Sequence, residues 1–119
     1  MNWYLTKLVY RIICGRGTHT PQFEEQLRLV EAPSKEEALR KAQAIGRSEA
    51  LQFYNDKQEL VQWKFINVSE LYQLNEIVDG TEIYSRIEER HEAEAFEDMV
   101  HNRATYLQDE VNTPHLQHK

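Results

Sequence analysis

The stretch Val61-Gln62-Trp63-Lys64-Phe65-Ile66-Asn67-Val68 decides the fold that we expect from this sequence. Its first half alternates like a β-strand, with Trp63 and Phe65 on one face. In its second half the apolar positions change parity, to Ile66 and Val68. Because side chains along a strand alternate with a period of two, such a change requires a β-bulge or a bend. The sequence therefore predicts a bent strand that starts near residue 60.

The bend and the segment that follows it predict a hairpin. Asn67 is the expected extra residue of the bulge, because asparagine tolerates a left-handed backbone better than most residues. Asp79-Gly80 is typical of a tight turn. Residues 81–87 then alternate cleanly, with Ile83 and Ile87 expected on the inward face. We therefore expect a second strand over these residues.

Two further strands are expected in the N-terminal part of the chain. Residues 3–13 carry apolar side chains on both faces, which favours a central strand that is covered on both sides. Residues 15–21 are loop-like in composition, and residues 22–31 form the next strand. In that strand we expect Phe23, Leu27 and Leu29 to point inward and Glu24, Gln26 and Arg28 to point outward.

A helix begins after Pro33. Ser34 and Glu37 have the spacing of a capping box, in which each side chain satisfies an unpaired amide of the first turn. The helix is expected to run to about Phe53 or Tyr54. One stripe along it, where Glu49 also projects, contains the apolar or small residues Ala38, Leu39, Ala42, Ile45, Gly46 and Phe53.

A second helix is expected over residues 91–108. Its apolar face consists of Ala93, Phe96, Met99, Val100, Ala104 and Leu107. The predicted fold class is α+β with ββαββα order, in which two helices pack on a four-stranded, mainly antiparallel sheet. This order matches a permuted ferredoxin-like fold. We expect one domain over residues 1–110 and a flexible tail over residues 111–119.

The composition limits the classes of partner. The chain has 119 residues, with 20 acidic and 14 basic side chains and a net charge of −6. The basic residues are scattered, whereas nucleic-acid binders gather them on one face, so no nucleic-acid partner is expected. There is neither a signal peptide nor an apolar run long enough for a membrane helix. A single cysteine excludes an intramolecular disulfide and fits the cytoplasm.

Cys14 and His19 flank a Gly-Arg-Gly loop. They could form a thiol nucleophile with its base, or the loop could bind an anion through Arg16. The simpler interpretation is an inert strand-end cysteine and a solvated histidine, because nothing in the sequence orients His19 toward Cys14. We therefore assign no catalytic residue, and keep Arg16 and His19 as binding candidates.

Two other groups of polar residues have ordinary explanations. His91, Glu94, Asp98 and His101 share one arc of the second helix, but that arc lies opposite the apolar face and suits solvent. No metal and no cofactor are expected. Glu49 could serve as a general acid or base if it were buried. Since an unpaired buried charge is costly, we expect it instead to reach the rim or to pair with a neighbour such as Arg11 or Lys7.

The aromatic residues of the bent strand could also line a pocket. Trp63 and Phe65 would provide apolar walls, with Lys64 and Tyr72 as polar groups nearby. Core packing is the commoner use of alternating aromatic residues. The binding candidates from the whole sequence are Arg16, His19, Trp63, Lys64 and Tyr72.

Several segments together resemble a small, mainly bacterial family that is known only as domain of unknown function number 4288. These segments are Asn2–Leu8, Phe23–Leu29, the Ala-rich helix after Glu36-Glu37, Trp63–Val68 and Asp79–Ile83. Many members have glycine where this chain has Asn67, and both residues permit an unusual backbone. The resemblance implies no known activity, substrate or cofactor, and no functional residue is carried over from it.

The sequence favours a small, cytoplasmic, non-enzymatic binding domain that homodimerises. The apolar residues on both faces of the first strand support this interpretation, since one face must find cover. One alternative is an acidic immunity- or antitoxin-like protein, whose negative surface would mask a basic partner. Another is a small-molecule binder or enzyme with a pocket near Trp63 and Tyr72.

Overall fold

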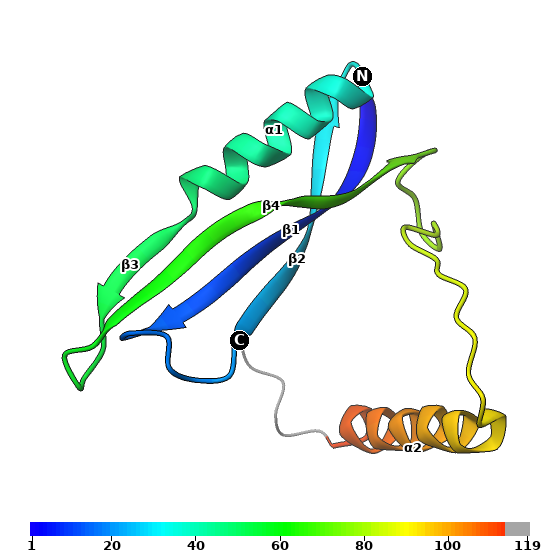
Figure 1. Ribbon diagram of the computed structural model, residues 1–119. Coiled ribbons are helices and arrows are strands. Elements are labelled where there is room, and N and C mark those ends of the chain that lie inside the picture. Colours follow the sequence, from blue (N-terminus) through cyan, green and yellow to red (C-terminus); the bar gives the residue numbers. More distant parts are fainter. Residues whose placement is uncertain (114–119) are drawn as a thin grey trace. The chain divides into compact units, whose positions relative to one another are not determined.

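The chain forms a four-stranded antiparallel sheet and two helices (Figure 1). The computed structural model describes residues 1–113. These residues fall into two compact units, one over Met1–Ser85 and the other from Arg86 onward. The elements are β1 (Asn2–Cys14), β2 (Gln22–Ala32), α1 (Lys35–Ser48), β3 (Leu51–Tyr54), β4 (Leu60–Leu74) and α2 (Ala93–Val111). The predicted α+β class and ββαββα order are confirmed.

The strands of the sheet lie in the order β2-β1-β4-β3, and all neighbours are antiparallel. Two hairpins, β1-β2 and β3-β4, therefore meet through their long strands β1 and β4. The sheet places β1 beside β4 at its centre. Figure 1 shows both central strands curving along their length, with α1 lying across one face.

The core lies between α1 and the face of the sheet that α1 covers. One cluster contains Tyr4, Val30, Ala32 and Ala38. A second cluster contains Leu8, Tyr10 and Ala42, with Trp63, Phe65 and Val68 packed against it. Trp63 and Phe65 thus pack against the core, which is the commoner use of alternating aromatic residues.

The orientation of β2 is the reverse of our expectation. Phe23 and Leu27 are 58% and 54% exposed on the face opposite α1, while Glu24, Gln26 and Arg28 lie on the helix side. The register sets this orientation, because Glu24 pairs with Tyr10, whose side chain is buried beneath α1. Alternation alone predicts two faces, but it does not say which face the helix covers.

The bend predicted in β4 is present, but Asn67 is not its extra residue. Lys7 pairs with Glu70, and the next residues of β1 pair with Val68, Asn67 and Phe65, so Ser69 and Ile66 are left over. Asn67 lies between these two bulges and does not have a positive φ. Its Oδ1 accepts hydrogen bonds from the Val68 amide at 2.8 Å and from Gln43 Nε2 at 3.1 Å. The asparagine thus satisfies backbone that the bulges release, without a left-handed conformation.

Helix α1 starts as predicted and ends earlier. Ser34 Oγ accepts a hydrogen bond from the Glu37 amide at 3.2 Å, which confirms the cap. The helix ends at Ser48, and Glu49 is its C-cap. The expectation that it runs to Phe53 or Tyr54 was wrong, because residues 51–54 pair with the start of β4 and form β3. Residues 55–59 therefore connect two strands, β3 and β4.

The strand expected over residues 81–87 does not form. The Asp79-Gly80 turn is present, with Gly80 at φ 85° and the Thr81 amide bonded to the Val78 carbonyl at 3.0 Å. After the turn, Tyr84 packs on Tyr72 with ring centroids 5.7 Å apart. Tyr84 thus packs on the face of the sheet opposite α1 without forming a backbone ladder, whereas Ile83 and Ile87, which we expected to point inward, are 46% and 97% exposed.

Helix α2 belongs to the second unit and begins and ends slightly later than predicted. Met99, Val100 and Leu107, from its expected apolar face, are exposed. The packing of this helix on the sheet and the single domain over residues 1–110 stay predictions. The tail expected over residues 111–119 lies, from residue 114 onward, outside the described residues.

Candidate functional site

A groove of about 360 Å³ lies beside Trp63, on the helix side of the sheet where α1 ends. Tyr10 of β1 forms part of its lining. Its polar residues are Glu24 and Gln26 of β2 and Glu49 after α1, and its apolar residues are Leu51, Phe53 and Trp63. The groove exists because α1 stops at Ser48, so the last part of this face is not covered by helix.

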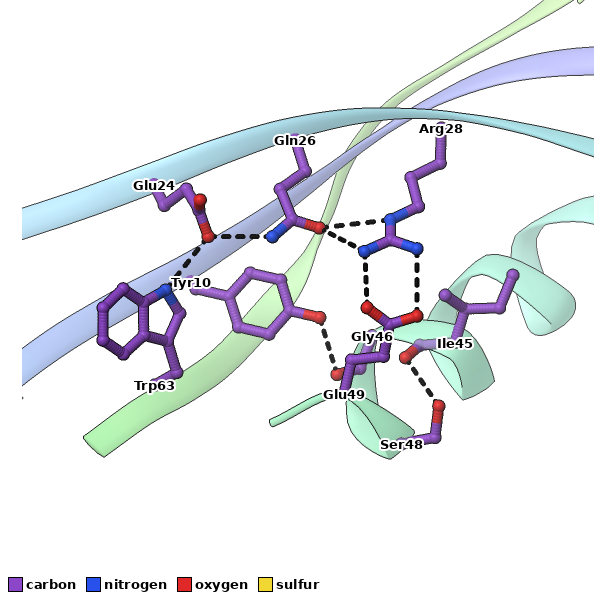
Figure 2. A network of polar contacts seen from close by, with 9 residues as sticks. All are labelled: Tyr10, Glu24, Gln26, Arg28, Ile45, Gly46, Ser48, Glu49 and Trp63. Carbon is purple, nitrogen blue, oxygen red and sulfur yellow. Dashed lines mark hydrogen bonds and ion pairs between the residues drawn. The ribbon is translucent and has the colours of Figure 1, made fainter. Parts of the chain in front are cut away.

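One wall of the groove is a continuous chain of hydrogen bonds (Figure 2). Trp63 Nε1 donates to Glu24 Oε1 at 3.0 Å, and Gln26 Nε2 donates to the same oxygen at 2.8 Å. Arg28 donates to Gln26 Oε1 at 2.8 and 3.1 Å and to both carboxylate oxygens of Glu49. Alternation along β2 puts its three polar residues in one row, which produces this wall.

The facing wall is aromatic and apolar. Phe53 stacks on Trp63 with ring centroids 6.3 Å apart and an angle of 22° between the planes. Leu51 pairs with Trp63 in the β3-β4 ladder. Leu51 and Phe53 are 48% and 46% exposed. Large apolar side chains that remain exposed in a concave site provide contact area for a ligand.

Tyr10 fixes the base of the groove to the helix. Its hydroxyl donates to the Gly46 carbonyl at 2.9 Å, which satisfies one of the acceptors that a helix end leaves unpaired. Burial, and then the charge of Glu49, raise the pKa of Tyr10, so that the hydroxyl stays neutral. This bond connects the base of the groove to the last turn of α1.

Glu49 is half exposed at the rim and pairs with Arg28 of β2. The neighbour that we expected was Arg11 or Lys7, and Lys7 instead contacts Glu25 and Glu70. The wall contains two carboxylates, of Glu24 and Glu49, and one guanidinium, of Arg28. Because Arg28 pairs with Glu49, the wall carries one excess negative charge, that of Glu24.

The structure separates the residues that were expected to form one pocket. Trp63 pairs with Ile12 and Tyr72 pairs with Leu5, so their side chains lie on opposite faces of the sheet. The hydroxyl of Tyr72 donates to Glu70 at 2.7 Å, and this bond raises the pKa of Tyr72. Lys64 lines a second hollow, of about 640 Å³, together with Trp63. Two of the five binding candidates, Trp63 and Lys64, thus lie at the same hollow.

Arg16 and His19 belong to the loop after β1 and do not line the groove. His19 Nε2 accepts from the Cys14 amide at 3.0 Å, so Nδ1 carries the proton and donates to the Thr20 carbonyl at 2.9 Å. The ring therefore stabilises the loop. Arg16 is exposed to solvent.

Cys14 and His19 do not form a thiol–histidine pair. The thiol lies 3.7 Å from Glu59 Oε1 and 3.8 Å from Asn55 Nδ2, while His19 contacts the backbone amide of the cysteine. Burial, and then the carboxylate of Glu59, raise the pKa of Cys14, which favours the neutral thiol over the reactive thiolate.

Two further observations concern residues 1–113. No group of three or more His, Cys, Asp or Glu side chains in this range is placed to hold a metal ion. His91, Glu94, Asp98 and His101 are exposed. Within the same range, no helix is both long enough and apolar enough to cross a membrane.

Sequence reasoning missed most of this groove. The row of Glu24, Gln26 and Arg28 was visible but was expected to face solvent, and Phe53 was expected in a helix. One signal in the sequence could have shown that these residues act together. Glu24, Gln26 and Arg28 are spaced two residues apart, so they lie on the same face of a strand. Their partners come from three other elements, and no local pattern identifies them.

Comparison with known proteins gives a family without a described function. A search of curated proteins found no match, and a search of solved structures found none. The part of the chain that carries the sheet and α1 corresponds closely to one family model. The model of the family described as Domain of unknown function (DUF4288) matches residues 3–85, and the chain therefore belongs to this family.

Proposed function

We propose that this protein is a cytoplasmic, non-enzymatic binding domain that homodimerises through the open face of its sheet. The open face is the side of the sheet opposite α1. Its exposed large apolar residues are Trp3, Phe23, Leu27, Leu29 and Tyr72, of which the least exposed, Trp3, is 37% accessible. The exposure of these five side chains on one face is the observation that carries the proposal. Monomeric proteins rarely expose large contiguous apolar patches without a partner.

The strand register gathers the apolar residues into one patch. Leu29 of β2 lies opposite Leu5 of β1, and Leu5 lies opposite Tyr72 of β4. These three residues form a row across the sheet. Leu27 and Phe23 continue the patch along β2 toward the loop, because residues two apart on a strand share a face.

The charges of the open face permit a second copy to approach. Lys7, Arg11 and Lys64 lie on this face with Glu25, Glu31 and Glu70, so three positive charges balance three negative ones. A two-fold contact brings identical patches together, and a balanced patch avoids net repulsion.

One alternative function has a specific observation in its favour. The net charge of −6 suits an acidic immunity- or antitoxin-like protein that masks a basic partner. The two functions differ in how they respond to salt, because a charged complex weakens as salt screens it, whereas an apolar dimer does not. The proposal keeps the cytoplasm as the location, since the chain carries a single cysteine.

Sedimentation velocity of the full chain at micromolar concentration tests the dimer. The expected result is a concentration-dependent dimer for the natural sequence and a monomer for Leu27→Lys, which places a charge in the apolar patch. Leu39→Lys is the matched control, because Leu39 is 37% exposed on α1, away from the open face. A natural sequence that stays monomeric at every concentration would overturn the proposal, as would equal effects of the two variants.

A further inference from the structure

We propose that the groove beside Trp63 binds an organic cation, either an alkylammonium or a guanidinium group. This site lies on the helix side of the sheet, while the proposed dimer uses the open face. The inference is therefore independent of the dimer, and either one can fail without the other. Four features of the groove support it: an oriented carboxylate, an aromatic wall, its charge and its size.

The carboxylate of Glu24 is held in one orientation. Its Oε1 accepts hydrogen bonds from Trp63 Nε1 and from Gln26 Nε2. Both donors come from rigid strands, and neither carries a charge. Among the hydrogen bonds of the described residues, none goes to Glu24 Oε2, so this oxygen remains available to a ligand. A donor that carries a positive charge would make the strongest hydrogen bond to it.

The aromatic wall suits the same kind of ligand. The stacked rings of Phe53 and Trp63 border the groove that Glu24 also lines. Aromatic faces attract cations through the negative charge density above the ring. Leu51, beside them, offers an apolar surface on which the alkyl stem of such a cation can pack.

The charge of the groove excludes the other ligand classes. Arg28 is already engaged by Glu49, so the negative charge of Glu24 stays uncompensated. An anion would be repelled, and a neutral ligand would cover the carboxylate without pairing it, which costs free energy. The wall itself illustrates the chemistry, since Gln26 and Glu49 together hold the guanidinium of Arg28 (Figure 2).

The size of the groove limits the ligand to one small group. Its volume is about 360 Å³, near the lower end of the range of roughly 300–1,000 Å³ that is usual for small-molecule sites. A single arginine- or lysine-sized side chain, or a free amine of similar size, fits within it.

Titration of the full chain with small cations tests the site. The probes are N-acetyl-argininamide and n-butylammonium, and their neutral counterparts are N-acetyl-citrullinamide and n-butanol. The reporter is the indole N–H of Trp63 in proton–nitrogen correlation spectra, with Trp3→Phe used to assign it. We expect saturable shifts with a Kd of about 1 mM for the cations, and no saturation for the neutral probes. Equal shifts with charged and neutral probes would overturn the proposal.

Two glutamate variants separate a site from diffuse attraction. Glu24→Gln keeps an oxygen acceptor for Trp63 and removes the charge, so cation binding should weaken about tenfold. Glu25→Gln makes the same change one residue along β2, on the open face, and should leave binding unchanged. Well-dispersed amide spectra of both variants show that they are folded. Equal weakening by both variants would mean that no specific site exists.

The origin of the cation is settled by a third comparison. If the natural ligand is the side chain of a basic protein, a Gly-Gly-Arg-Gly-Gly peptide should bind more tightly than N-acetyl-argininamide and should shift amides of β3. If the ligand is a free amine, n-butylammonium should bind at least as tightly as the peptide. Both results support the cation site, whereas failure of all three probes to saturate overturns it. Leu27→Lys should bind the cations as well as the natural sequence does.

Discussion

At the scale of single residues, Gly46 shows how closely α1 approaches the sheet. A Cβ atom built on this glycine would lie 2.2 Å from Cε1 of Phe65. The ring of Phe65 also packs on Tyr10, with centroids 5.5 Å apart, so it has little freedom to move away. The carbonyl of Gly46 accepts the Tyr10 hydroxyl. One position thus determines both the helix–sheet distance and the base of the groove.

Gly46→Ala should therefore destabilise the protein, although alanine is the better helix former. Overpacking against Phe65 costs about 1–3 kcal/mol, and the gain in helix propensity returns about 1 kcal/mol. The expected result is a lower urea midpoint. Combining the change with Phe65→Leu, which makes room for the methyl group, should recover part of the loss. A Gly46→Ala variant that is more stable than the natural protein would contradict the close approach.

At the scale of elements, the start of α1 depends on a single side chain. Ser34 Oγ satisfies the amide of Glu37. Ser34→Ala should lower the free energy of unfolding by about 1 kcal/mol, as is usual for the loss of an N-cap. Urea denaturation measures the change, and Ser34→Asp, which keeps an acceptor, serves as the control. If alanine and aspartate behave alike, the cap does not stabilise this helix.

The sequence predicted these elements well wherever a residue forms a hydrogen bond with the backbone of a residue close to it in the chain. The cap at Ser34, the turn at Asp79-Gly80 and the bend near Asn67 were all visible in the sequence. The end of α1 was not visible in the sequence. It depends on residues 51–54, which form backbone hydrogen bonds with β4 and not with the helix. Strand formation depends on such partners more than on propensity.

The candidate site was harder to predict for the same reason. Trp63 was recognised, but the face of β2 that carries Glu24 was assigned the wrong way round. An alternating strand with apolar residues on one face and polar residues on the other normally buries the apolar face. Here the polar face lies on the helix side, because its residues bond to one another and to Glu49. A partly buried polar network of this kind appears only once the strands are assembled.

At the scale of the whole molecule, the ionisable groups with shifted pKa values predict sensitivity to alkaline pH. Bonding to Glu70 is the main cause that raises the pKa values of Lys7 and Tyr72, and burial is the main cause for Tyr10 and Cys14. Each group therefore holds its proton more tightly in the folded chain than in the unfolded chain. Since the native state then binds more protons, the unfolding free energy must fall as pH rises.

The fall should begin near the ordinary pKa of 9.0 for the Cys14 thiol and continue through 10.0 and 10.5 for the tyrosines and Lys7. Urea midpoints measured between about pH 8 and about pH 10.5 check this expectation. Tyr72→Phe should flatten the alkaline part of the curve. A midpoint that stays constant or rises over this range would show that folding does not raise the pKa values of these groups.

The paired bulges of β4 have a consequence for how copies of the chain can associate. β3 pairs with residues 60–63 of β4 alone, so in the described chain the outer edge of β4 beyond that point has no strand beside it. A regular free edge invites strand-by-strand stacking into fibres. Ile66 and Ser69 interrupt the regular spacing of donors and acceptors along this edge. The same two residues that bend the sheet therefore also protect it against open-ended aggregation.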